Sequence, residues 1–230
     1  MDTTIYSDGT YLENNPDWHA DDSAWKARHV AGILARNGVA PKSVCEIGCG
    51  AGEVLRNLSQ ELPGAARFVG YDISPQAYRL CSSKSAARIE FRLGNMLEEP
   101  VEFDLAMAID VFEHVEDYFD FLRRLRTKAQ HKVFHIPLDL SALALLRGEP
   151  ARMRKSVGHI HYFDKDTALA ALEDTGHRVI DWHYTSGRTE LPNLGWKSRL
   201  MKLPRKAMYS VNSDFAVKSL GGYSLLVLAT

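Results

Sequence analysis

Short apolar runs with high β-propensity alternate with segments of helical period along most of this chain. The apolar runs predict seven strands, at 43–47, 66–72, 87–93, 103–110, 131–137, 177–184 and 222–229. Amphipathic periodicity and capping residues predict helices at 21–37, 53–62, 75–86, 117–129 and 165–176. Strands that alternate with helices are typical of an α/β fold, in which a mainly parallel sheet is covered on both faces.

Two regions interrupt the alternation, about 138–162 and 186–220. Insertions after strand ends are where α/β enzymes build substrate pockets, because ligands bind at the carboxyl edge of the sheet. We therefore expect a single domain over 1–230, with a cap segment at 1–40 and two insertions on the substrate side. The first insertion carries Arg147, Arg152, Arg154 and Lys155, which could bind an anionic substrate group or form a solvated lid. The basic run at 197–206 is expected to be a solvated helix face.

The composition is that of an ordinary globular protein, with 45% hydrophobic and 25% charged residues. A formal net charge of −1 gives no general attraction to phosphate polymers, so we expect no nucleic-acid partner. The polar opening lacks a secretory signal, and no apolar run approaches the roughly 20 residues that span a bilayer. These features predict a cytoplasmic protein without a membrane partner. We expect either a monomer or a homodimer, and the sequence does not distinguish between them.

A glycine-rich stretch, EIGCGAG, lies where the first strand gives way to a helix. Glycines let a ligand approach the backbone closely, and the helix amino end offers N–H groups to it. A dinucleotide fingerprint would need glycine where the chain has Glu53, and a carboxylate there opposes a pyrophosphate. The acid before the loop, Glu46, suits the ammonium group of an amino acid, which favours S-adenosylmethionine over NAD.

Polar residues follow three further strands. Asp72 comes about 20 residues after the last glycine of the loop, where a carboxylate can accept both ribose hydroxyls, although it could instead cap the helix that follows. Ile73 would then lie against adenine, and Asn95 could meet the adenine edge. Asp110 follows the fourth strand. Side chains at the ends of parallel strands share one edge of the sheet, so we expect them to line one cleft.

These motifs, EIGCGAGE, YDIS, GNM, DVFEHV and the final GYSLLVLA strand, resemble the class I S-adenosylmethionine-dependent methyltransferases. The resemblance implies a doubly wound, Rossmann-like sheet of seven strands whose last strand is antiparallel. It also implies that S-adenosylmethionine is the cofactor and is held by Glu46, Gly48, Cys49, Gly50, Gly52, Asp72, Ile73, Asn95, Met96, Asp110 and Val111. The opening around Trp18 and His19 resembles a bacterial subgroup in which this segment closes over the cofactor, so Tyr6, Tyr11, Trp18 or His19 could line the pocket.

Methyl transfer needs the nucleophile and the methyl group held in line, and it needs a base only if the acceptor must lose a proton. The candidate catalytic residues are His114, His135 and His159. No carboxylate–histidine set of diagnostic spacing accompanies His159 and His161, so we expect no metal. The sequence thus predicts methyl transfer to a small polar molecule, with anionic character and O- or N-methylation left open. The alternatives are a nicotinamide-dependent oxidoreductase and a non-catalytic cofactor-binding module of the same fold.

Overall fold

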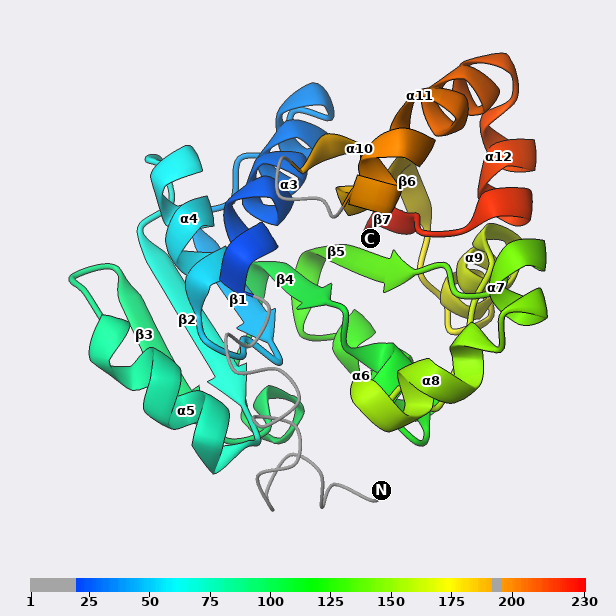
Figure 1. Ribbon diagram of the computed structural model, residues 1–230. Coiled ribbons are helices and arrows are strands. Elements are labelled where there is room, and N and C mark those ends of the chain that lie inside the picture. The colour runs from blue at the N-terminus through cyan, green and yellow to red at the C-terminus, as the bar shows by residue number, and fades with distance from the viewer. Residues whose placement is uncertain (1–19, 192–195) are drawn as a thin grey trace.

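A computed structural model describes residues 20–191 and 196–230, and the strands of this part form one seven-stranded sheet (Figure 1). The strand order is β3-β2-β1-β4-β5-β7-β6. Only β7 is antiparallel to its neighbours, β5 and β6, as the sequence predicted. The bounds are β1 Ser43–Ile47, β2 Arg67–Asp72, β3 Ile89–Leu93, β4 Phe103–Ile109, β5 Ala129–Pro137, β6 Val179–Thr185 and β7 Ser224–Ala229.

A helix is present at each of the five positions that the periodicity predicted, although α6 ends before the predicted residue 129, where β5 begins. They are α3 Ser23–Arg36, α4 Glu53–Glu61, α5 Pro75–Cys81, α6 Tyr118–Arg126 and α9 Lys165–Asp174. The helix predicted at 75–86 is shorter, because α5 ends at Cys81 and a 3-10 turn, Ser82–Lys84, follows it.

Both predicted insertions contain helices that the alternation did not reveal. The first holds α7 Ala142–Leu146 and α8 Glu149–Ser156, and the second holds α10 Gly187–Glu190, α11 Trp196–Val211 and α12 Ser213–Leu220. Figure 1 shows α8 beside the carboxyl ends of the central strands and α11 and α12 together at the far edge of the sheet.

Two hydrophobic clusters fill the two sides of the sheet. On one side α3 and α4 contribute Ala27, Val30, Ile33, Leu34, Leu55 and Leu58. On the other side α6 and α9 contribute Phe121, Leu122, Leu125, Ala168, Ala171 and Leu172. Strand residues divide between the clusters by the two-residue period, so that in β7 Leu226 and Leu228 face α3 whereas Leu225 and Val227 face the other side. Burial on both faces explains why these strands are continuous apolar runs.

The first helix, α3, is fixed against the second insertion by polar contacts. Trp25 Nε1 donates to Glu190 at 2.8 Å, and His29 Nε2 lies 2.8 Å from the same carboxylate. A ring nitrogen of His29 also lies 3.0 Å from a ring nitrogen of His183, so this histidine makes polar contacts with two other segments. Tyr6, Tyr11, Trp18 and His19 lie outside the described residues.

Within the described residues, no helix is both long enough and apolar enough to cross a bilayer.

Candidate functional site

The glycine loop between β1 and α4 has the backbone that the sequence predicted. Gly48, Gly50 and Gly52 have φ values of 66°, 53° and 78°, a region that residues with a Cβ atom rarely adopt. Space is limited as well: a Cβ on Gly48 would lie 2.9 Å from a methyl carbon of Val111, and one on Gly52 would lie 2.6 Å from the ring of Phe91. The loop is therefore shaped by its glycines.

Asp72 holds this loop from the end of β2. One carboxylate oxygen accepts from the Gly50 N–H at 2.9 Å, and the other accepts from the Ser74 N–H at 2.8 Å. The cap of α5 is Ser74, whose side chain accepts from Gln76 and Ala77, so Asp72 is not itself the cap. Burial raises the pKa of Asp72, and the two backbone hydrogen bonds oppose that rise.

Two cavities lie on either side of the glycine loop, and Gly48 lines both. The first, which we call the Glu46 cavity, has a volume of about 310 Å³ and is lined by the loop together with Glu46, Glu53, Lys26, Asp110, His114 and His159. The second, the Ile73 cavity, has a volume of about 450 Å³ and is lined by Tyr71, Asp72, Ile73, Asn95 and Val111. The structure thus brings together residues that follow β1, β2, β3 and β4.

Glu46 lies almost fully buried in the first cavity, with 2% of its surface exposed. Its Oε2 atom is buried without a hydrogen-bond partner among the described residues. Burial raises the pKa of Glu46 to about 8, although the nearby cation of Lys26 lowers it. A buried carboxylate oxygen without a donor costs free energy, so this position fits a ligand that supplies one.

A buried lysine that the sequence analysis did not single out joins α3 to the end of β4. Lys26 Nζ lies 3.0 Å from Asp22 and 2.9 Å from Asp110. The other oxygen of Asp110 lies 2.6 Å from His135 Nδ1, and His135 Nε2 lies 2.9 Å from the Thr185 hydroxyl. His135 and Lys26 together hold the pKa of Asp110 well below its usual range, despite burial. Asp110 is therefore an anion with both oxygens paired.

Not every predicted residue faces a cavity. His135 is 3% exposed and is bonded to Asp110. This position suits a residue that orients Asp110 better than a base that contacts the acceptor. The side chain of Met96 is fully buried in the cluster beside α6. Asn95 lines the Ile73 cavity, while its carbonyl oxygen accepts from the Leu97 N–H at 3.1 Å. Cys49, by contrast, lines the Glu46 cavity.

His114 and His159 both line the Glu46 cavity. His114 belongs to the 3-10 turn Phe112–His114, and His159 follows α8. Their rings lie edge to face with centroids 4.8 Å apart. His159 Nδ1 lies 2.6 Å from Asp139, a residue that sequence reasoning also missed. His161, two residues on, instead lies 3.1 Å from the backbone oxygen of Glu116.

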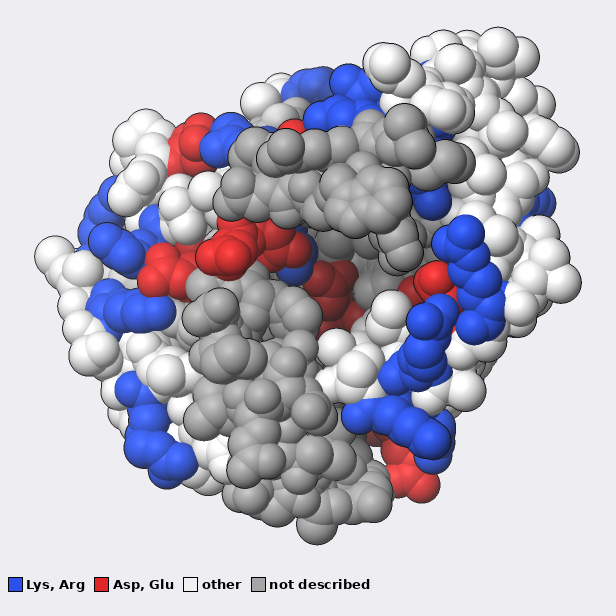
Figure 2. Space-filling view, in the orientation of Figure 1, with Lys and Arg blue, Asp and Glu red and all other residues white. Residues whose placement is uncertain are grey.

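The charge of the Glu46 cavity is negative. Its described lining holds one lysine, Lys26, and five carboxylate residues, which are Asp22, Glu46, Glu53, Asp110 and Asp139. The basic residues of the first insertion do not contribute, because Arg147, Arg152, Arg154 and Lys155 are exposed and α8 lines the cavity with Met153. Figure 2 shows acidic atoms within a hollow and a row of basic side chains along its rim, over α7 and α8. The wall favours cationic or neutral ligands over anions.

Known proteins resemble this chain both in amino-acid sequence and in fold. Residues 18–181 match the family model described as a methyltransferase domain. An ajmaline N-methyltransferase of Rauvolfia serpentina is 25% identical over 132 residues, which are 51% of this chain and 45% of that protein. A ubiquinone biosynthesis O-methyltransferase of Bradyrhizobium diazoefficiens is 38% identical over 86 residues, which are 35% of this chain and 33% of that protein.

The matched part therefore covers less than half of either relative. Among solved structures, the magnesium protoporphyrin IX methyltransferase of Synechocystis PCC 6803 with bound S-adenosylhomocysteine superposes with a TM-score of 0.60 at 17% identity, over 90% of this chain and 82% of that one. Because the family model covers most of the sequence, the chain belongs to the methyltransferase-domain family. Its seven-stranded sheet with an antiparallel last strand is the class I fold that the resemblance implied.

Proposed function

We propose that this protein transfers a methyl group from S-adenosylmethionine to a small molecule. The observation that carries the proposal is the pair of cavities that meet at Gly48. One holds the buried Glu46 oxygen that has no hydrogen-bond partner among the described residues, and the other is bordered by Asp72. An amino acid joined to a nucleoside matches this division. The structural neighbour with bound S-adenosylhomocysteine supports the same cofactor.

The methionine portion belongs in the Glu46 cavity. Glu46 accepts from its ammonium, and the N–H groups of the glycine loop donate to its carboxylate. Asp72 accepts from the ribose hydroxyls, since an ionised carboxylate has capacity for more than the two backbone donors it already has. Ile73, which is 52% exposed in the Ile73 cavity, supplies an apolar surface for adenine, and Asn95 lies at its edge.

When bound, the cofactor supplies an electrophilic methyl group on a sulfonium centre. The residues of this chain hold the two reactants in line, which by itself accounts for much of the acceleration in a displacement of this kind. The acceptor binds at the end of the Glu46 cavity, beside His114, His159 and Met153. Since carboxylates dominate the wall, we favour a neutral or cationic polar acceptor over the anionic one that the basic insertion had suggested.

The alternative of a nicotinamide-dependent oxidoreductase is disfavoured by Glu53. This carboxylate is the first residue of α4 and lines the Glu46 cavity, where a pyrophosphate would need the helix amino end. Its charge is partly balanced by Lys84 at 2.8 Å. The remaining alternative, a binding module without turnover, shares the cofactor site and differs only in activity.

Thermal unfolding with added ligands tests the proposal. A ligand that binds only the folded state stabilises it by an amount set by the ratio of its concentration to Kd, so S-adenosylhomocysteine should raise the melting temperature and NAD should not. Incubation with S-adenosylmethionine and panels of small amines and alcohols then separates an enzyme from a binding module. A shift with NAD and none with S-adenosylhomocysteine would overturn the cofactor assignment.

A further inference from the structure

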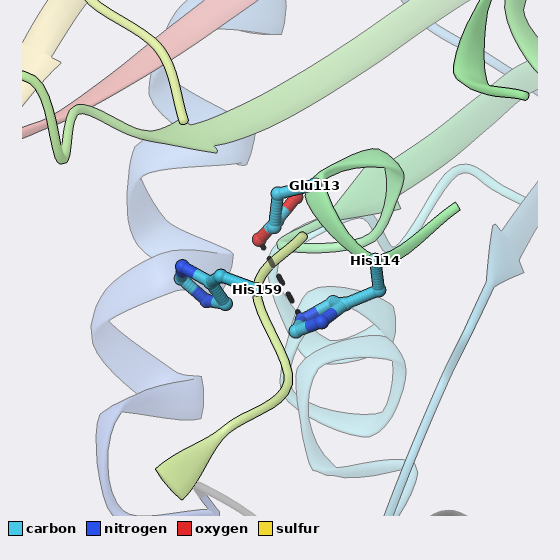
Figure 3. A group of neighbouring side chains, drawn as sticks. All are labelled: Glu113, His114 and His159. Atoms are coloured by element: carbon cyan, nitrogen blue, oxygen red, sulfur yellow. Dashed lines mark ion pairs between the residues drawn. The ribbon is translucent and has the colours of Figure 1, made fainter. Parts of the chain in front are cut away.

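Three side chains from two distant segments converge beside the proposed acceptor position. Glu113 and His114 are adjacent in the 3-10 turn after β4, and His159 comes from the segment after α8 (Figure 3). One ligand atom from each, a carboxylate oxygen and two ring nitrogens, can be chosen so that all lie within 4.8 Å of one another. Two atoms bound to one ion at about 2.1 Å with tetrahedral geometry are about 3.4 Å apart, so closing around an ion needs movements of about 1 Å.

The burial of Glu113 is not compensated by hydrogen bonds from the described residues. It is 1% exposed, and neither carboxylate oxygen has a hydrogen-bond partner among the described residues. Its nearest cationic candidate, His114 Nε2, is 3.9 Å away, too far for a hydrogen bond. A buried carboxylate without hydrogen-bond donors lowers the stability of the folded protein. A cation bound to one or both carboxylate oxygens would remove this free-energy cost.

The two histidines are oriented as metal ligands usually are. His159 Nδ1 is 2.6 Å from the carboxylate of Asp139, which fixes the proton on Nδ1 and directs the lone pair of Nε2 away from it. His114 Nδ1 is 3.1 Å from the Gly158 carbonyl oxygen, which can only accept, so in the neutral ring Nε2 again carries the lone pair. The carboxylate–histidine and carbonyl–histidine pairs are typical outer contacts of a metal site.

From this convergence we propose that Glu113, His114 and His159 bind a divalent transition-metal ion. Two imidazoles and one carboxylate are a ligand set found with Zn²⁺ and Fe²⁺, and they leave at least one coordination position open. Both histidines line the Glu46 cavity, so the open position faces the space proposed for the acceptor. The pair His159 and His161 alone did not predict a metal site, and Glu113 and His114 are more than 40 residues away in the sequence.

A consequence follows for the acceptor, and this consequence rests on the proposed methyltransferase function. An ion with an open position would bind an oxygen or nitrogen atom of the acceptor and orient it. In that state His114 and His159 are ligands and do not act as bases. Metal binding itself does not depend on the methyl-transfer reaction and can be measured without cofactor or acceptor.

The test uses the full chain, freed of metal with a chelator and then titrated with Zn²⁺ by calorimetry and with Co²⁺ by visible absorption. We expect one ion per chain. The visible absorption bands of bound Co²⁺ should be those typical of four- or five-coordinate complexes. Glu113→Gln and His114→Ala should each weaken Zn²⁺ binding about 100-fold or more, and Asp139→Asn should weaken it about 10- to 100-fold, as outer-contact substitutions do.

The matched control is His161→Ala, which removes a histidine of the same segment that bonds to the Glu116 backbone oxygen and should leave Zn²⁺ affinity unchanged. Circular dichroism checks that each variant is folded. The proposal is overturned if the wild-type chain binds neither ion, or if folded Glu113→Gln and His114→Ala variants keep wild-type affinity. If a variant does not fold, the wild-type Co²⁺ spectrum decides, because a surface-bound ion keeps the weak bands of the octahedral aquo ion. Metal binding without S-adenosylhomocysteine binding would refute the proposed function and leave the metal site standing.

Discussion

Replacing Asp72 with alanine separates its two proposed roles, that of holding the glycine loop and that of binding ribose. The change leaves the buried N–H groups of Gly50 and Ser74 without their acceptor. An unsatisfied buried donor costs about 1–3 kcal/mol, so the two together should lower the free energy of unfolding by about 2–6 kcal/mol. Loss of hydrogen bonds from ribose to a charged group should cost a further 1.5–3 kcal/mol of binding, by the same rough scale, or about 10- to 150-fold in Kd.

Asp104 provides a matched control at the opposite edge of the sheet. It also accepts from two backbone N–H groups, those of Lys42 at 2.7 Å and Ser43 at 2.9 Å. Urea unfolding measures stability, and calorimetric titration with S-adenosylhomocysteine measures affinity. Asp104→Ala should lose stability and keep affinity. The reasoning fails if Asp72→Ala keeps the wild-type Kd, or if both variants lose affinity equally.

Three further predictions follow from buried groups. Because the pKa of Glu46 is about 8, its carboxyl group is protonated near pH 6, whereas pairing with an ammonium group favours the ionised form. The affinity for S-adenosylhomocysteine should therefore rise as the pH increases from 6 to 8, by up to about tenfold per pH unit. Calorimetry should show no such rise in Glu46→Gln. Gly50→Val should lose measurable binding in the same titration, whereas Gly38→Val, at a similar φ of 67° with open space around it, should cost only the backbone strain of about 1–2 kcal/mol. Lys26→Met removes the cation between Asp22 and Asp110 and should lower the urea unfolding free energy by about 3 kcal/mol; an unchanged midpoint would mean that the pair contributes nothing.

The sheet could be predicted from the sequence because its signal is local. Strands buried on both faces are continuous apolar runs, and the order of strands and helices then restricts the topology. The glycine loop could also be predicted, because Gly48, Gly50 and Gly52 adopt positive φ angles that other residues rarely adopt. The position of Asp72 at the end of β2 was predicted, although its hydrogen bond to Gly50 was not.

The parts that could not be predicted depend on contacts between distant segments. Lys26 is an ordinary i+4 partner of Asp22, the residue before α3, and only the fold shows that it also reaches Asp110. The same holds for Glu113 and His159, whose approach requires the first insertion to fold back over the turn after β4. For His135 the sequence suggested an exposed position that the fold does not provide. Its place near the end of a strand suggested a residue of the cleft, whereas the ring is buried and contacts Asp110 and Thr185.

A crystal structure of the protein with S-adenosylhomocysteine tests the central claim most directly. The account predicts the amino acid portion in the Glu46 cavity, with its ammonium within hydrogen-bond distance of Glu46 Oε2, and the nucleoside in the Ile73 cavity, with its ribose hydroxyls at Asp72. A ligand bound elsewhere, or bound across the glycine loop with Glu46 and Asp72 making no contact to it, would contradict the account.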